Sequence, residues 1–222
     1  VNRVLRSGVL SIGPELEKFE DAIRRFIGVK HAVAVNSGTS ALHLLIRAFG
    51  IGDGDEVITT PFSFVASTNC ILFEGGKPVY VDIDPRTYNL DIAQIEEKIT
   101  PRTKAILPVD VFGQPFDIDA INEIARRHGL VVIQDSCEAL GSAWKGKMVG
   151  SQSHAATFAF YPNKQITTAE GGVIVTNDDE VAQLCRSMRS QGRAVTGTWL
   201  EHERLGYNYR LSEVHAAIGL AQ

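Results

Sequence analysis

Apolar residues recur along the chain with two spacings, which predict a regular succession of helices and strands. Apolar positions three or four residues apart predict amphipathic helices, and short continuous apolar runs predict buried strands. The pattern predicts helices over residues 14–26, 39–49, 65–73, 92–99, 118–128 and 180–190, and another from residue 211 onward. It predicts strands over residues 31–36, 56–60, 78–81, 104–109, 130–134, 155–160 and 172–176.

This alternation predicts an α/β fold with a mostly parallel central sheet and helices on both faces, since continuous apolar strands are typical of doubly covered sheets. We expect one domain over residues 1–222, with a helix and loop over 1–28, an αβα core over 29–190, and a loop and the start of a helix over 191–222. The chain lacks an initial Met and stops within a helical pattern, so we expect it to be part of a longer protein.

Composition narrows the class of protein. The 222 residues are 44% hydrophobic and 22% charged, as in ordinary globular proteins, and no apolar stretch is long enough to span a bilayer or act as a signal peptide. The net charge of −4 argues against nucleic-acid binding. Cys70, Cys137 and Cys185 fit buried thiols in a reducing cytosol better than a disulfide framework or a metal site. We therefore expect a cytoplasmic protein.

Two polar segments directly follow predicted strands, at the sheet edge where ligands bind in such folds. At residues 37–41 (SGTSA) a helix begins, and its free N–H groups, with Gly38 and the Thr39 hydroxyl, can bind an anion. The alternative is a capped helix start without a ligand. Asp135 ends an apolar strand, where its carboxylate can bond a protonated ring nitrogen, or it is simply a helix N-cap.

Lys164 follows Pro162 in a turn-rich segment between two predicted strands. The aromatic residues Phe158, Phe160 and Tyr161 before it indicate a partly desolvated amine. Desolvation favours the neutral amine, which is nucleophilic towards an aldehyde. The alternative is a solvated surface lysine.

Two further positions carry weaker signals. Phe64 follows a strand end, where its ring can stack on a flat ligand, although a core phenylalanine is the alternative. Asn208 and Arg210 lie in a polar turn before the last predicted helix, and can be a simple helix lead-in.

Together these segments closely resemble the DegT/DnrJ/EryC1/StrS family of pyridoxal-phosphate (PLP) dependent sugar aminotransferases, within the fold type I aspartate aminotransferase superfamily. The resemblance runs from about the first helix to the last residue, and the spacing of Phe64, Asp135 and Lys164 matches without a gap. It implies PLP as cofactor, glutamate as amino donor, a keto-sugar nucleotide as acceptor and a homodimer with shared active sites. It also implies the PLP-binding large domain, with the C-terminal small domain missing.

The resemblance implies a role for each matching residue. Lys164 resembles the lysine that binds the cofactor covalently and moves the protons. Asp135 resembles the partner of the pyridine nitrogen, Phe64 the aromatic residue that stacks on the ring, and Gly38 and Thr39 the phosphate cradle.

Asn208 resembles the asparagine that reaches the phosphate of the other subunit's cofactor. Two positions depart from the family pattern. Ala159 stands where a serine often binds the phosphate, so Thr39, Asn208 or water must replace that donor. Glu138 stands where His or Gln often lies near the cofactor's phenolic oxygen, and a carboxylate there is repulsive unless it is protonated or turned away.

Two alternatives on the same fold are a PLP-dependent sugar dehydratase and a non-catalytic PLP-binding regulatory protein. Some relatives with His in place of the lysine are dehydratases, so Lys164 favours transamination. An NAD protein is a poor fit, because no G-x-G-x-x-G motif opens the first unit. We also expect substrate contacts from residues 11–13 and 196–204, and from the absent C-terminal region.

Overall fold

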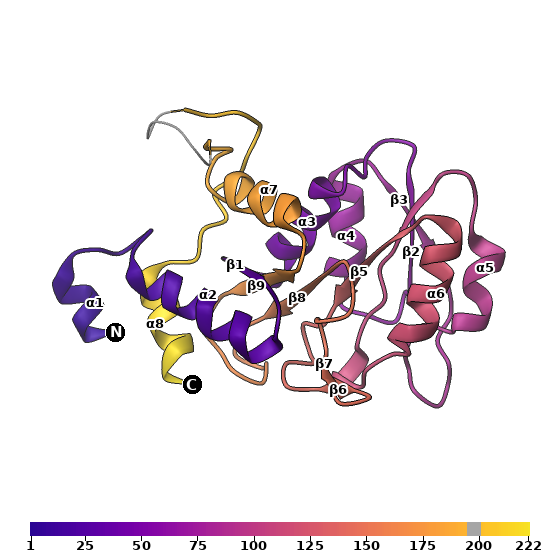
Figure 1. The fold of residues 1–222 in the computed structure, drawn as a ribbon, viewed down its shortest axis with the longest axis horizontal. Helices are drawn as coiled ribbons and strands as arrows, with labels where there is room; N and C mark the ends of the chain where they lie inside the picture. The colour runs from indigo at the N-terminus through magenta and orange to yellow at the C-terminus, as the bar shows by residue number, and fades with distance from the viewer. Residues whose placement is uncertain (195–200) are drawn as a thin grey trace.

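The computed structural model describes residues 1–194 and 201–222, in which helices and strands alternate (Figure 1). The helices are α1 (Asn2–Ser7), α2 (Pro14–Ile27), α3 (Gly38–Ala48), α4 (Ala66–Phe73), α5 (Ile95–Lys98), α6 (Ile118–His128), α7 (Asp179–Arg189) and α8 (Glu213–Ala221). The strands are β1 (His31–Val35), β2 (Glu56–Thr59), β3 (Lys77–Tyr80), β4 (Thr103–Ile106), β5 (Val131–Asp135), β6 (Ala143–Trp144), β7 (Lys147–Met148), β8 (Ala155–Ala159) and β9 (Gly172–Thr176). Two short 3₁₀ helices are η1 (Ile92–Gln94) and η2 (Val111–Gly113).

Each predicted helix and strand is present, with boundaries shifted by a few residues. The helix predicted over 92–99 is a 3₁₀ turn, η1, followed by the single turn α5. The hairpin of β6 and β7 was not predicted, because strands of two residues are too short to display an alternating pattern.

Seven strands form one sheet in the order β1-β9-β8-β5-β4-β2-β3. Strands β8, β5, β4, β2 and β3 pair in parallel, and β9 is antiparallel to both β1 and β8. The prediction of a mostly parallel sheet is therefore confirmed. Because β9 returns directly from β8, the loop between these two strands lies at the carboxyl edge, the edge at which the parallel strands end.

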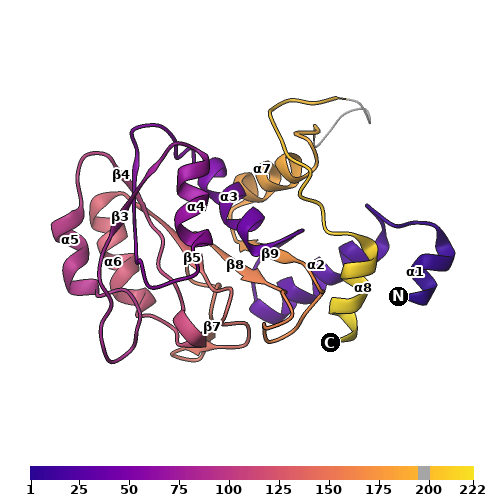
Figure 2. The same ribbon diagram turned by 180° about the vertical axis from the view of Figure 1, so that it is seen from behind.

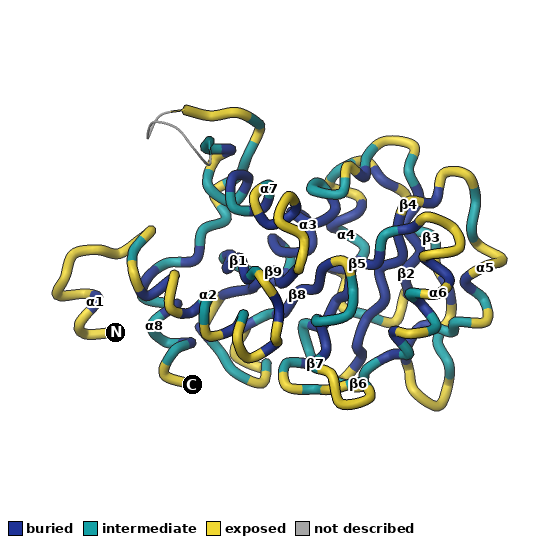
Figure 3. The backbone as a smooth tube through the Cα atoms, in the orientation of Figure 1, coloured by how far each residue is buried: buried dark blue, intermediate teal, exposed yellow. Residues whose placement is uncertain are grey.

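Helices cover both faces of the sheet, as predicted (Figures 1 and 2). Successive strand residues point to opposite faces. On one face, Val33, Ile133 and Ile174 pack with α3, α4 and α7 in one apolar cluster. On the other face, alternate strand residues pack in two clusters, one with α2 and α8 and one with α5 and α6. The tube in Figure 3 is accordingly buried along the central strands.

The carboxyl edge brings together segments that are distant in the sequence. Residue Gly172, at the start of β9, pairs with the last residues of β1 and β8. An added Cβ at Gly172 would lie 2.4 Å from the carbonyl oxygen of Ser37 and 2.7 Å from the Gly38 nitrogen, so only glycine allows this approach. The start of α3 is thereby held against the loop that follows β8.

A buried carboxylate joins the two ends of the chain. Glu213, at the start of α8, accepts hydrogen bonds from the N–H groups of Gly13, Glu15 and Leu16 at the start of α2. A negative charge is favourable at a helix N-terminus. Among the residues that the structure describes, no helix combines the length and apolar character needed to cross a bilayer.

Candidate active site at the carboxyl edge of the sheet

A cavity of about 570 Å³ opens at the carboxyl edge of the sheet. Its walls come from the start of α3, the segment after β2, the end of β5 and the loop between β8 and β9. Of the residues predicted to form a site, the cavity is lined by Gly38, Thr39, Phe64, Asp135, Glu138 and Lys164. The structure therefore brings together residues that lie more than a hundred positions apart in the sequence.

Asp135 lies at the end of β5, and only 5% of the residue is exposed. One carboxylate oxygen accepts from the Ser67 hydroxyl at 2.7 Å, and the other accepts from the Cys137 N–H at 3.2 Å. No helix follows directly, so the alternative of a helix N-cap is wrong. The carboxylate is held in one orientation by these two donors, and it faces the cavity with little access to bulk water.

The start of α3 forms another wall. The Ser37 side chain caps the helix by accepting from the Ser40 N–H at 3.0 Å. The N–H groups of Gly38 and Thr39 donate no hydrogen bond to any residue that the structure describes. A helix N-terminus with free N–H groups attracts an anion. The helix is therefore capped, and the N–H groups of Gly38 and Thr39 remain available as donors, so the predicted anion site stays a prediction.

Gly38 also lies against the floor of the site. An added Cβ at Gly38 would lie 2.8 Å from the Ala159 Cβ and 3.0 Å from the Cys137 Sγ. Burial raises the pKa of the Cys137 thiol well above its usual value, so the thiol stays neutral. The floor is therefore apolar and closely packed, and the start of α3 can lie against it only because Gly38 has no side chain.

Lys164 lies in the loop between β8 and β9, and its side chain is 16% exposed. The interpretation as a solvated surface lysine is therefore wrong. Phe158 and Phe160 do not shelter the amine as the sequence suggested, because both are buried in the apolar core. Tyr161 does line the cavity. The loop is closed at its base by hydrogen bonds between Phe160 and Thr168 and between Phe160 and Gly171.

Exposed aromatic side chains stand at the rim of the cavity. Phe64 is 79% exposed, so the alternative of a core phenylalanine is wrong. Phe62 also lines the cavity and contacts Tyr88 and Phe112, with ring centroids 5.8 Å and 6.0 Å apart. Tyr88 and Phe112 have positive φ angles of 62° and 55°, which are uncommon for aromatic residues. Such strain is typical of functional sites.

The sequence did not point to Asp110, a fully buried carboxyl group near Asp135. It accepts hydrogen bonds from the Gln134 side chain, the Ser136 hydroxyl and the Phe116 N–H. Burial raises the pKa of Asp110 to about 7, despite these donors. The signal that could have revealed it is its position after β4, where a polar residue ends an apolar run at the ligand edge.

Asn208 does not line the cavity. It is exposed, pairs with Ser190, and its carbonyl accepts from the Asn36 side chain at 3.4 Å. The segment 11–13, predicted to contact substrate, also lies outside the cavity, since Ser11 pairs with Ser212. In the other predicted substrate segment, residues 196–200 lie outside the described residues, and 201–204 do not line the cavity.

Comparison with known proteins gives a match over the whole chain. The model of the DegT/DnrJ/EryC1/StrS aminotransferase family matches residues 1–222. The GDP-perosamine synthase of Caulobacter vibrioides is 50% identical over 214 residues, which cover 96% of this chain and 57% of that protein. The UDP-2-acetamido-2-deoxy-3-oxo-D-glucuronate aminotransferase of Pseudomonas aeruginosa is 45% identical over 219 residues, which cover 98% of this chain and 60% of that protein.

Solved structures share the fold. The structure of NtdA from Bacillus subtilis with bound cofactor PMP has a TM-score of 0.94 and 36% identity, with 99% of this chain and 50% of that chain covered. The chain thus spans less than two thirds of the length of these relatives.

Proposed function

Because the chain belongs to the DegT/DnrJ/EryC1/StrS aminotransferase family, we propose that it is the PLP-binding large domain of an enzyme that aminates a keto-sugar nucleotide. The observation that carries this proposal is the convergence on one cavity of a sheltered amine, a strand-end carboxylate and a helix N-terminus with free N–H groups. We propose glutamate as the amino donor, as the family resemblance implies.

The residues present fit a flat, anionic aldehyde cofactor. The free N–H groups at Gly38 and Thr39 suit its phosphate. The buried carboxylate of Asp135 suits a protonated ring nitrogen, and the exposed ring of Phe64 suits stacking on the cofactor ring. The Lys164 amine completes the set, since a sheltered lysine can bond an aldehyde.

When bound, PLP supplies an electron-withdrawing ring that takes up negative charge from the substrate carbon. Asp135, oriented by Ser67 and the Cys137 N–H, holds the proton on the ring nitrogen. The Lys164 Nζ would take the proton from the α-carbon of the amino donor and deliver a proton to C4′ of the cofactor. The Phe64 ring lines the cavity, where it can stack on one face of the cofactor ring.

The relatives support the class of acceptor. One is a GDP-perosamine synthase, and another is an aminotransferase named for a UDP-linked 3-oxo sugar. Both names describe nucleotide sugars, so we propose a nucleotide-linked keto sugar as acceptor for this chain as well. The enzyme would then serve the biosynthesis of an amino sugar for a polysaccharide or a related product.

We further propose a homodimer with shared active sites, in which Asn208 reaches the cofactor phosphate in the other subunit. Its position supports this role, because Asn208 is exposed and lies outside the cavity of its own chain. The α4 region supports a partner surface, because Val65, Leu72 and Phe73 are each more than half exposed. Exposed apolar clusters of this kind are typical of interfaces.

We place the enzyme in the cytoplasm. The cysteines Cys70, Cys137 and Cys185 are all free thiols, which suits a reducing compartment.

The test uses the full-length protein loaded with PLP. Addition of glutamate should convert the cofactor to pyridoxamine phosphate, which absorbs at shorter wavelength, and a panel of keto-sugar nucleotides should then reverse the change. The acceptor that restores the first spectrum identifies the substrate. A protein that binds PLP but shows no spectral change with glutamate or other amino acids would refute the proposed transamination.

A further inference from the structure

Glu138 lies in the turn after β5, and three contacts define its position. One carboxylate oxygen is 3.4 Å from the Lys164 Nζ, and the other accepts from the Phe112 N–H at 2.9 Å. The carbonyl oxygen of Glu138 accepts from the side chain of Gln165, the residue that follows the lysine. Both the backbone and the side chain of Glu138 are therefore joined to the lysine loop.

The strand-end carboxylate that lines the same cavity, Asp135, forms no ion pair with Lys164 among the described residues. Both oxygens of Asp135 accept hydrogen bonds from Ser67 and from the Cys137 N–H. Within the described part of the chain, the ion-pair partner of Lys164 is Glu138. The lysine side chain is 16% exposed and the Glu138 side chain 41% exposed, so the amine is sheltered while the carboxylate stays hydrated. A hydrated carboxylate can balance a sheltered ammonium without the full cost of burying two charges.

The Phe112 N–H is aimed at the carboxylate by an unusual backbone. Phe112 has φ 55° and ψ 22° within η2, a left-handed conformation that costs free energy for a residue with a side chain. The next residue, Gly113, packs against the Glu138 backbone, and an added Cβ there would lie 2.9 Å from the Glu138 carbonyl oxygen. The loop after β4 is thus shaped around Glu138, and its N–H fixes the carboxylate.

We propose that Glu138 is a positioning residue that holds the Lys164 amine in its protonated state, when it is not bonded to the cofactor, with the carboxylate aimed by the Phe112 N–H. This inference rests on the proposed function, because it assigns the amine a free state during turnover. In that state the pair keeps the Nζ and its proton at the cavity wall, close to where the lysine must act. It also explains how a carboxylate can occupy a position near the cofactor's phenolic oxygen, because the Glu138 side chain is turned towards Lys164 and Phe112.

The test measures the charge state of the amine without relying on turnover. Full-length protein freed of cofactor is treated with fluorodinitrobenzene at pH 7.5, and the modification rate of Lys164 is followed by mass spectrometry of its peptide. Only the neutral amine reacts, and a neighbouring carboxylate favours the charged form. Glu138→Gln should therefore speed the modification by roughly fivefold or more, since it removes the counter-charge. Glu138→Asp, which keeps the charge, should stay closer to the wild-type rate.

Glu170→Gln is the matched control. Glu170 also lines the cavity, but its carboxylate forms no ion pair with Lys164 in the described structure. This variant should change the rate by less than about twofold, as expected for a hydrated charge. Equal rates in wild type, Glu138→Gln and Glu170→Gln would overturn the proposal.

A salt series on the wild-type protein covers the case in which Glu138→Gln does not fold. Raising the salt from about 0.05 to 1 M should screen this pair from the side of the hydrated carboxylate and increase the modification rate of Lys164. A salt-independent rate would contradict the ion pair. The labelling test is made without cofactor, so it gives a result even if the protein does not bind PLP. Failure to bind PLP would refute the proposed function alone.

Discussion

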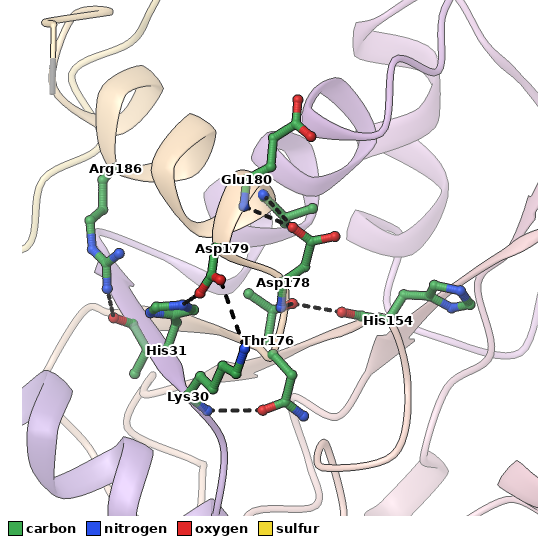
Figure 4. Close-up of polar contacts among 11 residues, drawn as sticks. Lys30, His31, His154, Thr176, Asp178, Asp179, Glu180 and Arg186 are labelled. Atoms are coloured by element: carbon green, nitrogen blue, oxygen red, sulfur yellow. Dashed lines mark hydrogen bonds and ion pairs between the residues drawn. The ribbon is translucent and has the colours of Figure 1, made fainter.

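The two edges of the same sheet treat their polar groups in opposite ways. At the amino edge, where β1, β8 and β2 begin, polar side chains are paired with one another. Asp179 forms ion pairs with His31 at 2.6 Å and with Lys30 at 3.8 Å, and the Thr176 hydroxyl donates to the His154 carbonyl (Figure 4). Glu56 at the start of β2 accepts from Thr100, Arg102 and Lys77.

At the carboxyl edge, groups are kept available or strained. The N–H groups of Gly38 and Thr39 donate to no described residue, Phe64 is exposed, and Phe112 has a left-handed backbone. The pKa values of one carboxyl group at each edge show the same contrast between the edges. Hydrogen bonds, the Thr100 one first, lower the pKa of Glu56 to about 2, whereas burial raises that of Asp110 to about 7. One edge is optimised for stability, and the other gives up stability for binding.

The largest effect is expected from Lys164→Ala. Loss of the amine should abolish the covalent link to PLP, seen as loss of its visible absorption band, and lower turnover by on the order of 10⁴-fold or more. Lys30→Ala, at the opposite edge, should leave both unchanged, because the Lys30 side chain is exposed and, among the described residues, forms an ion pair only with Asp179, at 3.8 Å. A Lys164→Ala protein with normal band and turnover would contradict the assignment.

Asp135→Asn should lower kcat by on the order of 10²–10³-fold, because a preorganised charge would no longer hold the ring proton. Steady-state kinetics with glutamate measure this loss. The control is Asp178→Asn, which removes a charge at the amino edge. There the side chain accepts from the N–H groups of Glu180 and Val181, and Asn caps a helix about as well. Near-normal turnover in Asp135→Asn would exclude the proposed role.

Asp110 makes stability depend on pH in one direction. Its pKa of about 7 in the folded state lies above the value near 4 of an unfolded chain, so between these values the folded state binds more protons. Stability should therefore fall as pH rises from about 4 to 7, by roughly 3 kcal/mol, and level off above pH 7. Urea unfolding at several pH values across this range should show that the free energy of unfolding depends less on pH in Asp110→Asn than in the wild type. The same slope in both proteins would contradict the assignment.

Glu56→Gln should cost about 2 kcal/mol of unfolding free energy at pH 7, the typical loss when a buried charged group loses hydrogen bonds. PLP absorption should not change. The sign with pH is the reverse of that for Asp110: because the folded pKa is lowered to about 2, the contribution is present above the unfolded value near 4.5 and is lost as pH falls towards 2. Equal acid stability of wild type and variant would exclude this contribution.

Gly38→Ala should give the smallest effect, roughly a tenfold loss of PLP affinity, or about 1.4 kcal/mol. Its Cβ would press on Ala159 and Cys137, which must shift. Fluorescence titration with PLP measures the loss. In the control Gly52→Ala, the nearest described neighbour of the added Cβ is the Glu74 carbonyl oxygen, at 3.5 Å, so affinity should be unchanged. Equal affinities in both variants would show that Gly38 does not determine binding.

The sequence by itself determined the order of helices and strands and the class of sheet, because apolar periodicity is a local property that survives packing. It also identified Asp135, Lys164 and Gly38 as candidates, since each follows or precedes a strong strand or helix signal. Only the tertiary structure decided what each side chain meets. The antiparallel return of β9 brings the Lys164 loop to the edge where Asp135 ends β5, and the turn after β5 places Glu138 against Lys164 and Phe112. The buried state of Asp110 was equally invisible in the sequence, because burial and hydrogen-bond partners depend on strands that are neighbours in space and distant along the chain.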